Sequence, residues 1–156
     1  MTALPAGVAI RRALPGDAEA VAALVDELRR HLGDPVGNLT AERIAEDAFG
    51  DEPEFELLVG ERDGRIVSYA LFFKSYEPAF AARGLYLADL CVASSERGRG
   101  IGRAMVEAVA AVAAERGRTF VWWLCQPGNE TALAFYRKLA PEITMPSVVH
   151  VLVIGT

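Results

Sequence analysis

The sequence has few residues of the kinds that bind metals or form disulfides. Of its 156 residues only two are Cys and two are His. Both cysteines, Cys91 and Cys125, fall in apolar, strand-like stretches, and the chain has no C-x-x-C motif. This pattern supports neither a disulfide framework nor a zinc site. We therefore expect no metal ion in the protein.

Long apolar runs are also missing. The longest, residues 108–114, is far shorter than the roughly 20 residues that span a bilayer. Near the N-terminus the arginines follow the apolar stretch, whereas in a signal peptide the positive charges precede it. We expect a cytoplasmic protein without a membrane-spanning segment.

An excess of positive charge is lacking too. The net charge is −5 and the pI is about 5.1. Because phosphate backbones are bound by basic surfaces, nucleic acid is not an expected partner. The acidic balance suits a small cationic substrate better. With 52% hydrophobic residues, the chain is long enough for one buried core, so residues 1–156 are expected to form a single domain.

The spacing of apolar residues predicts a mixed α/β domain with elements in the order β-α-α-β-β-β-α-β-α-β. Asp63-Gly64 is a favoured hairpin turn, so residues 55–60 and 66–73 are expected to pair antiparallel. Asp17, Thr40 and Asn129 are the expected N-caps of three helices. The other expected strands are 8–13, 84–92, 119–124 and 148–154, with a short one near 143–145, and the helices are 18–32, 41–49, 100–116 and 129–139.

Residues 94–105, SSERGRGIGRAM, place three glycines and three arginines between an expected strand and an expected helix. The N-terminus of a helix after a glycine-rich turn is suited to bind phosphate. A dinucleotide fingerprint would need a third glycine at position 103, where Arg103 stands. A P-loop would need Gly-Lys-Ser/Thr, which the chain does not contain. Both of these nucleotide sites are excluded.

The remaining pattern, Arg97-x-x-Gly100-x-Gly102, resembles the pyrophosphate loop of the GCN5-related N-acetyltransferase (GNAT) family. The preceding LYLADLCVASSERGRGIG resembles the family's fourth strand and loop, and the later NETALAFYRKL resembles its N-x-x-A-x-x-F-Y segment. The resemblance implies a single-domain fold with a mostly antiparallel mixed sheet, splayed between strands four and five and flanked by about four helices. It also implies acetyl-CoA as co-substrate.

The resemblance further implies which residues bind the coenzyme. The backbone amides of the loop would surround the pyrophosphate, and Gly100 and Gly102 would let its oxygens approach. The side chains of Arg99 and Arg103 are better explained as surface charges that steer an anionic ligand. The implied cofactor-binding residues are Leu90, Cys91 and Val92, beside the pantetheine arm, Arg97, Gly98, Arg99, Gly100, Ile101, Gly102 and Arg103 in the loop, and Asn129 and Tyr136.

Tyr136 matches the family tyrosine near the coenzyme sulfur and is the candidate general acid, although a tyrosine that packs in the core is the alternative. A backbone N–H at or near Leu90 would face the developing oxyanion. The family's strand-four carboxylate falls at Ala88, so this sequence lacks that base. Strand alternation would place Asp89 on the opposite face, where a hydrogen bond to a helix is its expected role.

Other candidates for the base stay open at this point. They are Glu56, Tyr76, Glu77 and a chain of water molecules, while Gln126 and Cys125 are poor bases when neutral.

Three functions fit these observations. The first is an N-acetyltransferase acting on a primary amine by direct attack in a ternary complex, similar to the branch that acetylates polyamines and diamines. The second is an acyl-CoA sensor with little catalysis, which the missing carboxylate at Ala88 favours. The third is acetylation of a protein N-terminus or lysine. This function would need an open groove for a peptide, and the fold of residues 33–50 would decide whether one is present. The apolar residues 148–154 could pair across a homodimer interface or within the same sheet.

Overall fold

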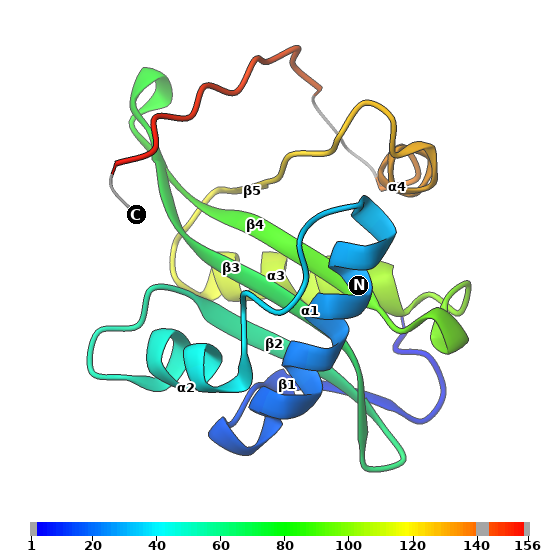
Figure 1. Ribbon diagram of the computed structural model, residues 1–156. Coiled ribbons are helices and arrows are strands. Elements are labelled where there is room, and N and C mark those ends of the chain that lie inside the picture. Colours follow the sequence, from blue (N-terminus) through cyan, green and yellow to red (C-terminus); the bar gives the residue numbers. More distant parts are fainter. Residues whose placement is uncertain (1–2, 140–143, 155–156) are drawn as a thin grey trace. The chain divides into compact units, whose positions relative to one another are not determined.

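The computed structural model describes residues 3–139 and 144–154, in two compact parts that meet in sequence between Leu124 and Cys125. The first part contains a five-stranded sheet in the order β1-β2-β3-β4-β5 (Figure 1). Neighbouring strands are antiparallel except β4 and β5, which are parallel, so the mixed sheet is confirmed. The strands are β1 (Val8–Arg12), β2 (Glu56–Arg62), β3 (Arg65–Glu77), β4 (Ala82–Val92) and β5 (Phe120–Trp122).

The hairpin between β2 and β3 is confirmed at the expected turn. Asp63 and Gly64 have φ values of 51° and 74°. A two-residue hairpin turn with positive φ at both positions matches the right-handed twist of the strands. The pairing continues along β3 well beyond residue 73, because β4 folds back against the other edge of β3 as far as Glu77.

Helices cover both faces of this sheet. In Figure 1, α1 (Ala18–Leu32) lies in front of the strands and α3 (Ile101–Glu115) behind them. Helix α2 (Ala41–Phe49) packs beside α1 and is capped by Thr40, whose hydroxyl accepts from the Arg43 N–H at 3.2 Å. The buried core on the α1 side comprises Ala13, Ala18, Val21, Leu24, Val25, Ile44, Leu57, Val59, Tyr69, Leu71 and Cys91.

Strands β4 and β5 are paired over a short distance only. Their register joins Gly84 to Phe120, Leu85 to Val121 and Tyr86 to Trp122. Gly84 is required here, because a Cβ on it would lie 2.4 Å from the Phe120 ring. Beyond Tyr86, the described residues provide no strand partner on this edge of β4. The expected splay between strands four and five is therefore present.

The second part of the chain differs from the sequence prediction. Helix α4 (Glu130–Tyr136) is shorter than the expected 129–139. The expected strand at 148–154 is wrong, because these residues have no secondary structure. An apolar pattern shows that a strand would be favourable, but a strand also needs a hydrogen-bonded neighbour. The strand expected near 143–145 falls partly on Ile143, outside the described residues, and Thr144 and Met145 are not in a strand.

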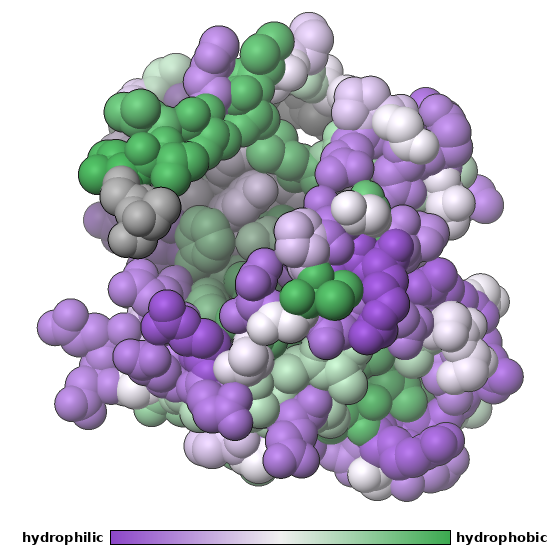
Figure 2. All heavy atoms as spheres, in the orientation of Figure 1, coloured by the Kyte–Doolittle hydropathy of each residue, from purple (hydrophilic) through white to green (hydrophobic). Residues whose placement is uncertain are grey.

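The apolar side chains of residues 148–154 are mostly exposed, from 63% for Val149 to 87% for Ile154. Figure 2 shows them as a continuous hydrophobic patch. Among the described residues, no helix is both long enough and apolar enough to cross a membrane.

Candidate functional site

The turn between β4 and α3 has the backbone of an anion site. A short 3-10 helix, η3 (Ser94–Glu96), follows β4, and Gly100 is the N-cap of α3. Gly98 and Gly100 have φ values of 75° and 84°, a region that other residues enter only at a cost. The first N–H groups of α3 have no partner within the helix, and the helix dipole adds positive charge there. A pyrophosphate group fits such a turn.

The other loop residues are placed as follows. Ile101 is buried beneath the first turn of α3, where Gly102 and Arg103 follow it. The Arg97 Nε donates a hydrogen bond to the Val92 carbonyl at 3.0 Å. The Arg99 Nε lies 3.8 Å from a Glu96 carboxylate oxygen. The side chains of Arg97 and Arg99 therefore contact groups of the protein itself.

The edge of β4 that faces away from β3 is the expected site of the pantetheine arm. Leu90, Cys91 and Val92 lie in the part of β4 beyond its pairing with β5. On their other side all three are in register with β3. Cys91 is buried, and burial is the main reason why the pKa of its thiol is raised to about 11. The thiol is thus neutral at physiological pH and a poor nucleophile.

A β-bulge changes the expected placement of Asp89. Leu71 of β3 is opposite Asp89 and Phe72 is opposite Leu87, so Ala88 is the extra residue in β4. Ala88 packs against the core under α1, and Asp89 is bonded to α1. The two side chains therefore share one face. The expectation that Asp89 points to the opposite face is wrong, because alternation fails at a bulge.

Asp89 does have the expected hydrogen bonds. Its carboxylate accepts from the Arg29 guanidinium of α1 and from the Tyr69 hydroxyl, the latter at 3.1 Å. Tyr69 is fully buried. Burial, followed by the charge of Asp89, raises the pKa of the Tyr69 phenol, so the hydroxyl keeps its proton and remains a donor.

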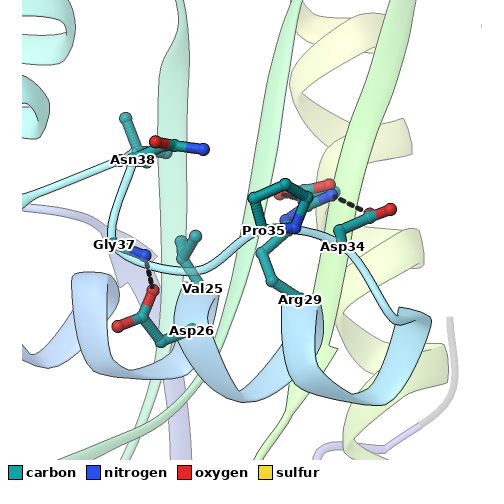
Figure 3. A pocket seen from close by; sticks show the side chains of 9 residues that line it. Val25, Asp26, Arg29, Asp34, Pro35, Gly37 and Asn38 are labelled. Atoms are coloured by element: carbon teal, nitrogen blue, oxygen red, sulfur yellow. Dashed lines mark hydrogen bonds and ion pairs between the residues drawn. The ribbon is translucent and has the colours of Figure 1, made fainter.

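A cavity of about 330 Å³ opens beside this carboxylate. Figure 3 shows side chains of α1 facing the loop that leads to α2, with Asp26 bonded to the Gly37 amide and Arg29 paired with Asp34. The lining holds three carboxylates and one guanidinium, so its net charge is negative. The lining residues are Val25, Asp26, Arg29, Asp34, Pro35, Gly37, Asn38, Leu39 and Asp89.

The other candidates for the base lie in different surroundings. Glu56 accepts two hydrogen bonds from Arg116, both at 2.6 Å, and one from Arg12 at 3.0 Å. Chiefly because of Arg116, the pKa of Glu56 is lowered, which makes it a weaker base. Glu77 accepts from the Ala79 N–H at 3.0 Å near the tip of the β3–β4 hairpin, and Tyr76 is exposed beside it.

The second part of the chain holds the remaining predicted site residues. The Asn129 side chain accepts from the Ala132 N–H at 3.1 Å, so its capping role is confirmed. Tyr136, at the end of α4, makes an edge-on contact with Phe135 at 5.1 Å between ring centres. Burial and Glu130 raise the pKa of the Cys125 thiol.

Of the charged residues that line the cavity, the sequence singles out Asp89 alone. Asp26 and Arg29 lie on α1, and Asp34 follows the C-cap of that helix, where no motif marks it. Their polar character beside the apolar stripe of α1 is the one available signal. Within residues 3–139 and 144–154, no three His, Cys, Asp or Glu side chains are grouped as a metal site would require.

Comparisons with known proteins point to one family of enzymes. The model of the Acetyltransferase (GNAT) family matches residues 21–140. The thialysine N-epsilon-acetyltransferase of Bos taurus is 32% identical over 145 residues, which are 86% of this chain and 84% of the relative. The human spermidine/spermine N(1)-acetyltransferase-like protein 1 is 28% identical over 136 residues, 81% of this chain and 19% of that protein.

Among solved structures, a possible acetyltransferase from Clostridium difficile 630 has a similar fold, with a TM-score of 0.79 at 17% identity. The match covers 95% of this chain and 99% of that one.

Proposed function

The chain belongs to the GNAT family of acetyltransferases, and we propose that it transfers the acetyl group of acetyl-CoA to a primary amine of a small molecule. In this proposal the amine attacks the thioester directly while both substrates are bound. The state of the cysteines supports direct attack. Burial raises the pKa of both thiols, so neither is disposed to form an acyl-enzyme.

The observation that carries the proposal is the acidic cavity between α1, the segment that follows it, and Asp89 of β4. An amine substrate is a cation in solution, and three carboxylates against one guanidinium favour a cation. The named substrates of the relatives, thialysine and spermidine or spermine, are consistent with an acceptor of this class.

The segment between α1 and α2 supports a small acceptor over a protein substrate. Residues 34–39 fold over the cavity and supply several of its lining groups. This segment partly encloses the cavity, which suits a small acceptor better than a peptide, since a peptide would need an open groove.

Acetyl transfer needs an oxyanion donor, a proton for the departing thiolate and a neutral amine. We assign the first role to a β4 backbone N–H at or near Leu90 and the second to Tyr136. No side chain is assigned as base. An amine with a pKa near 10 loses its proton to water often enough for slow turnover, and a rising proportion is neutral as the pH increases.

The proposal is tested by thiol release from acetyl-CoA with a panel of acceptors: thialysine, spermidine, ornithine, a peptide with a free N-terminus, and no amine. We expect release with at least one small amine and none with the peptide. Without a side-chain base, kcat/KM should rise with pH toward the pKa of the amine. Release with the peptide alone would contradict the small-molecule assignment.

The role of Tyr136 is tested by Tyr136→Phe. A general acid contributes roughly 10²- to 10⁴-fold, so kcat should fall within that range while the KM for acetyl-CoA changes little. Phe135→Leu, one residue away, is the matched control for packing at the end of α4. If Tyr136→Phe keeps full activity, the tyrosine has only a packing role.

A second function, acyl-CoA sensing with little catalysis, is favoured by one observation. Position 88 is an alanine that is partly buried against the core, and the neighbouring Asp89 carboxylate is already bonded to Arg29 and Tyr69. Tight binding of acetyl-CoA in calorimetry, combined with no turnover on any amine, would favour the sensor.

We further propose that residues 1–156 form one acetyltransferase domain that works in the cytoplasm as a homodimer. The exposed apolar residues 148–154 support an interface, since so many uncovered apolar side chains usually mark one. Light scattering of the full chain and of Val151→Lys tests this. The full chain should be dimeric and the variant monomeric; a monomeric full chain would contradict it.

A further inference from the structure

One carboxylate of α1 contacts both ends of the turn that opens the loop. Glu27 Oε1 accepts from the Ser94 N–H at 2.8 Å and lies 3.6 Å from the Arg97 Nη2. Arg97 in turn donates through Nε to the carbonyl of Val92, the last residue of β4. Glu27 therefore connects the start of η3, the arginine after it and, through that arginine, the end of the strand.

The same turn is fixed from a second direction. Glu96 is buried, with 8% of its surface exposed, and its carboxylate is 2.5 Å from the Arg62 Nη1 at the end of β2. Arg62 also donates to the Ala6 carbonyl at 2.7 Å. The side of the turn that faces β2 is thus held by one ion pair and the side that faces α1 by Glu27.

From these contacts we propose that Glu27 is a positioning residue for the acyl-CoA loop, acting through the Ser94 amide and the Arg97 side chain. Arg97 braces the loop internally, and the pyrophosphate is bound by the backbone. This inference rests on the proposed function, since it presumes that the loop binds acetyl-CoA.

If Glu27 acted only through its negative charge, it would weaken acetyl-CoA binding, whereas a positioning residue strengthens it. A carboxylate close to a loop that binds a pyrophosphate repels the ligand, so removing its charge should tighten binding if electrostatics dominate. A positioning residue does the reverse, because its loss lets the loop leave the conformation that presents its N–H groups. The sign of the change in affinity therefore separates the two roles.

The decisive experiment is calorimetric titration of acetyl-CoA into the wild type, Glu27→Gln and Glu19→Gln. Glu19 is an exposed glutamate on the same helix, so it controls for the change in net charge. Glu27→Gln removes hydrogen bonds to a charged group at a partly exposed site. We therefore expect its Kd for acetyl-CoA to be about 5- to 20-fold weaker. Glu19→Gln should stay within about 2-fold of the wild type.

In steady-state kinetics, Glu27→Gln should raise the KM for acetyl-CoA and leave the KM for the amine unchanged. Glu27→Asp keeps the charge and withdraws it by one methylene, and it should weaken acetyl-CoA binding in the same direction. An unchanged or tighter Kd in folded Glu27→Gln would overturn the proposal, and so would wild-type affinity in Glu27→Asp. A wild type that does not bind acetyl-CoA would instead refute the proposed function.

The Arg97 contact is tested by combining Glu27→Gln with Arg97→Ala. If Glu27 acts through Arg97, the double variant should bind acetyl-CoA almost as well as the single variant that has the larger loss of affinity. Fully additive losses would show that Glu27 and Arg97 affect the loop independently, and would overturn the action of Glu27 through Arg97.

Discussion

The loop after β4 and the cavity beside α1 are held in different ways. The loop depends on two glycines with positive φ, on Glu27 of α1, and on the ion pair between its own Glu96 and Arg62 of β2. The cavity depends on a few charged side chains, chiefly Arg29 between Asp34 and Asp89. The first region is thus determined largely by its backbone and the second by its side chains. We therefore expect substitutions in the loop to change the binding of acetyl-CoA and substitutions in the cavity to change the binding of the amine.

Among substitutions that compare these two regions, Asp89→Asn in the cavity should have the largest effect. Its carboxylate is mostly buried, and its loss leaves Arg29 and the Tyr69 hydroxyl with a weaker acceptor. We expect a loss of about 2 kcal/mol in the free energy of unfolding, measured with urea, and a higher KM for the amine. The control is Asp51→Asn at an exposed site.

If the two regions are separable, acetyl-CoA should bind Asp89→Asn with an affinity within about 2-fold of the wild type. If Asp89→Asn weakens the binding of acetyl-CoA as much as that of the amine, the cavity and the loop depend on each other.

Gly100→Ala should have the next largest effect, on the loop. A side chain in the left-handed region costs about 1–2 kcal/mol, which corresponds to an approximately 5- to 30-fold weaker Kd for acetyl-CoA if the loop shifts to avoid the strain. Calorimetry measures the Kd. Gly16→Ala, at a glycine without positive φ and with open space around it, is the matched control. A raised KM for the amine with an unchanged Kd for acetyl-CoA would be the reverse of the expected pattern.

Glu56→Gln should have the smallest effect and should spare both regions. Arg116 holds the pKa of Glu56 below its ordinary value of 4.5 in the folded protein, so its ionised form stabilises the fold above that pH. At pH 7 the variant should lose about 1 kcal/mol of unfolding free energy. The difference should shrink as the pH falls through the folded pKa, because the wild type then loses the same charge.

Denaturant titrations at pH 7 and pH 3 measure this difference. Turnover at pH 7 should be unchanged, and a large loss of kcat in Glu56→Gln would make this glutamate a functional group after all.

The part of the site that the sequence predicts well is the part set by backbone conformation. The glycines at 98 and 100 predict a turn because few other residues adopt positive φ values. Asp63-Gly64 predicts a hairpin turn for the same reason. The pairing of β2 with β3 and the face of α1 that enters the core follow from local periodicity as well. These features need no knowledge of distant residues.

The cavity could not be predicted in this way, because its groups come from positions 25–39 and from Asp89, which meet only in the folded chain. The bulge was missed since it depends on the register between two strands. The strand expected at residues 148–154 failed for a related reason, as apolar residues alone do not supply a hydrogen-bonded neighbour. The strand-and-turn pattern thus predicts the loop, while the cavity beside α1 can be found only from the tertiary structure.

The bulge in β4 also affects how this chain should be compared with its relatives. In a regular strand, moving an acidic residue by one position sends it to the other side of the sheet. Positions 88 and 89 share a side here, so an acid at either position faces the same volume. The alanine at position 88 therefore does not leave this side of β4 without a carboxylate, because Asp89 supplies one.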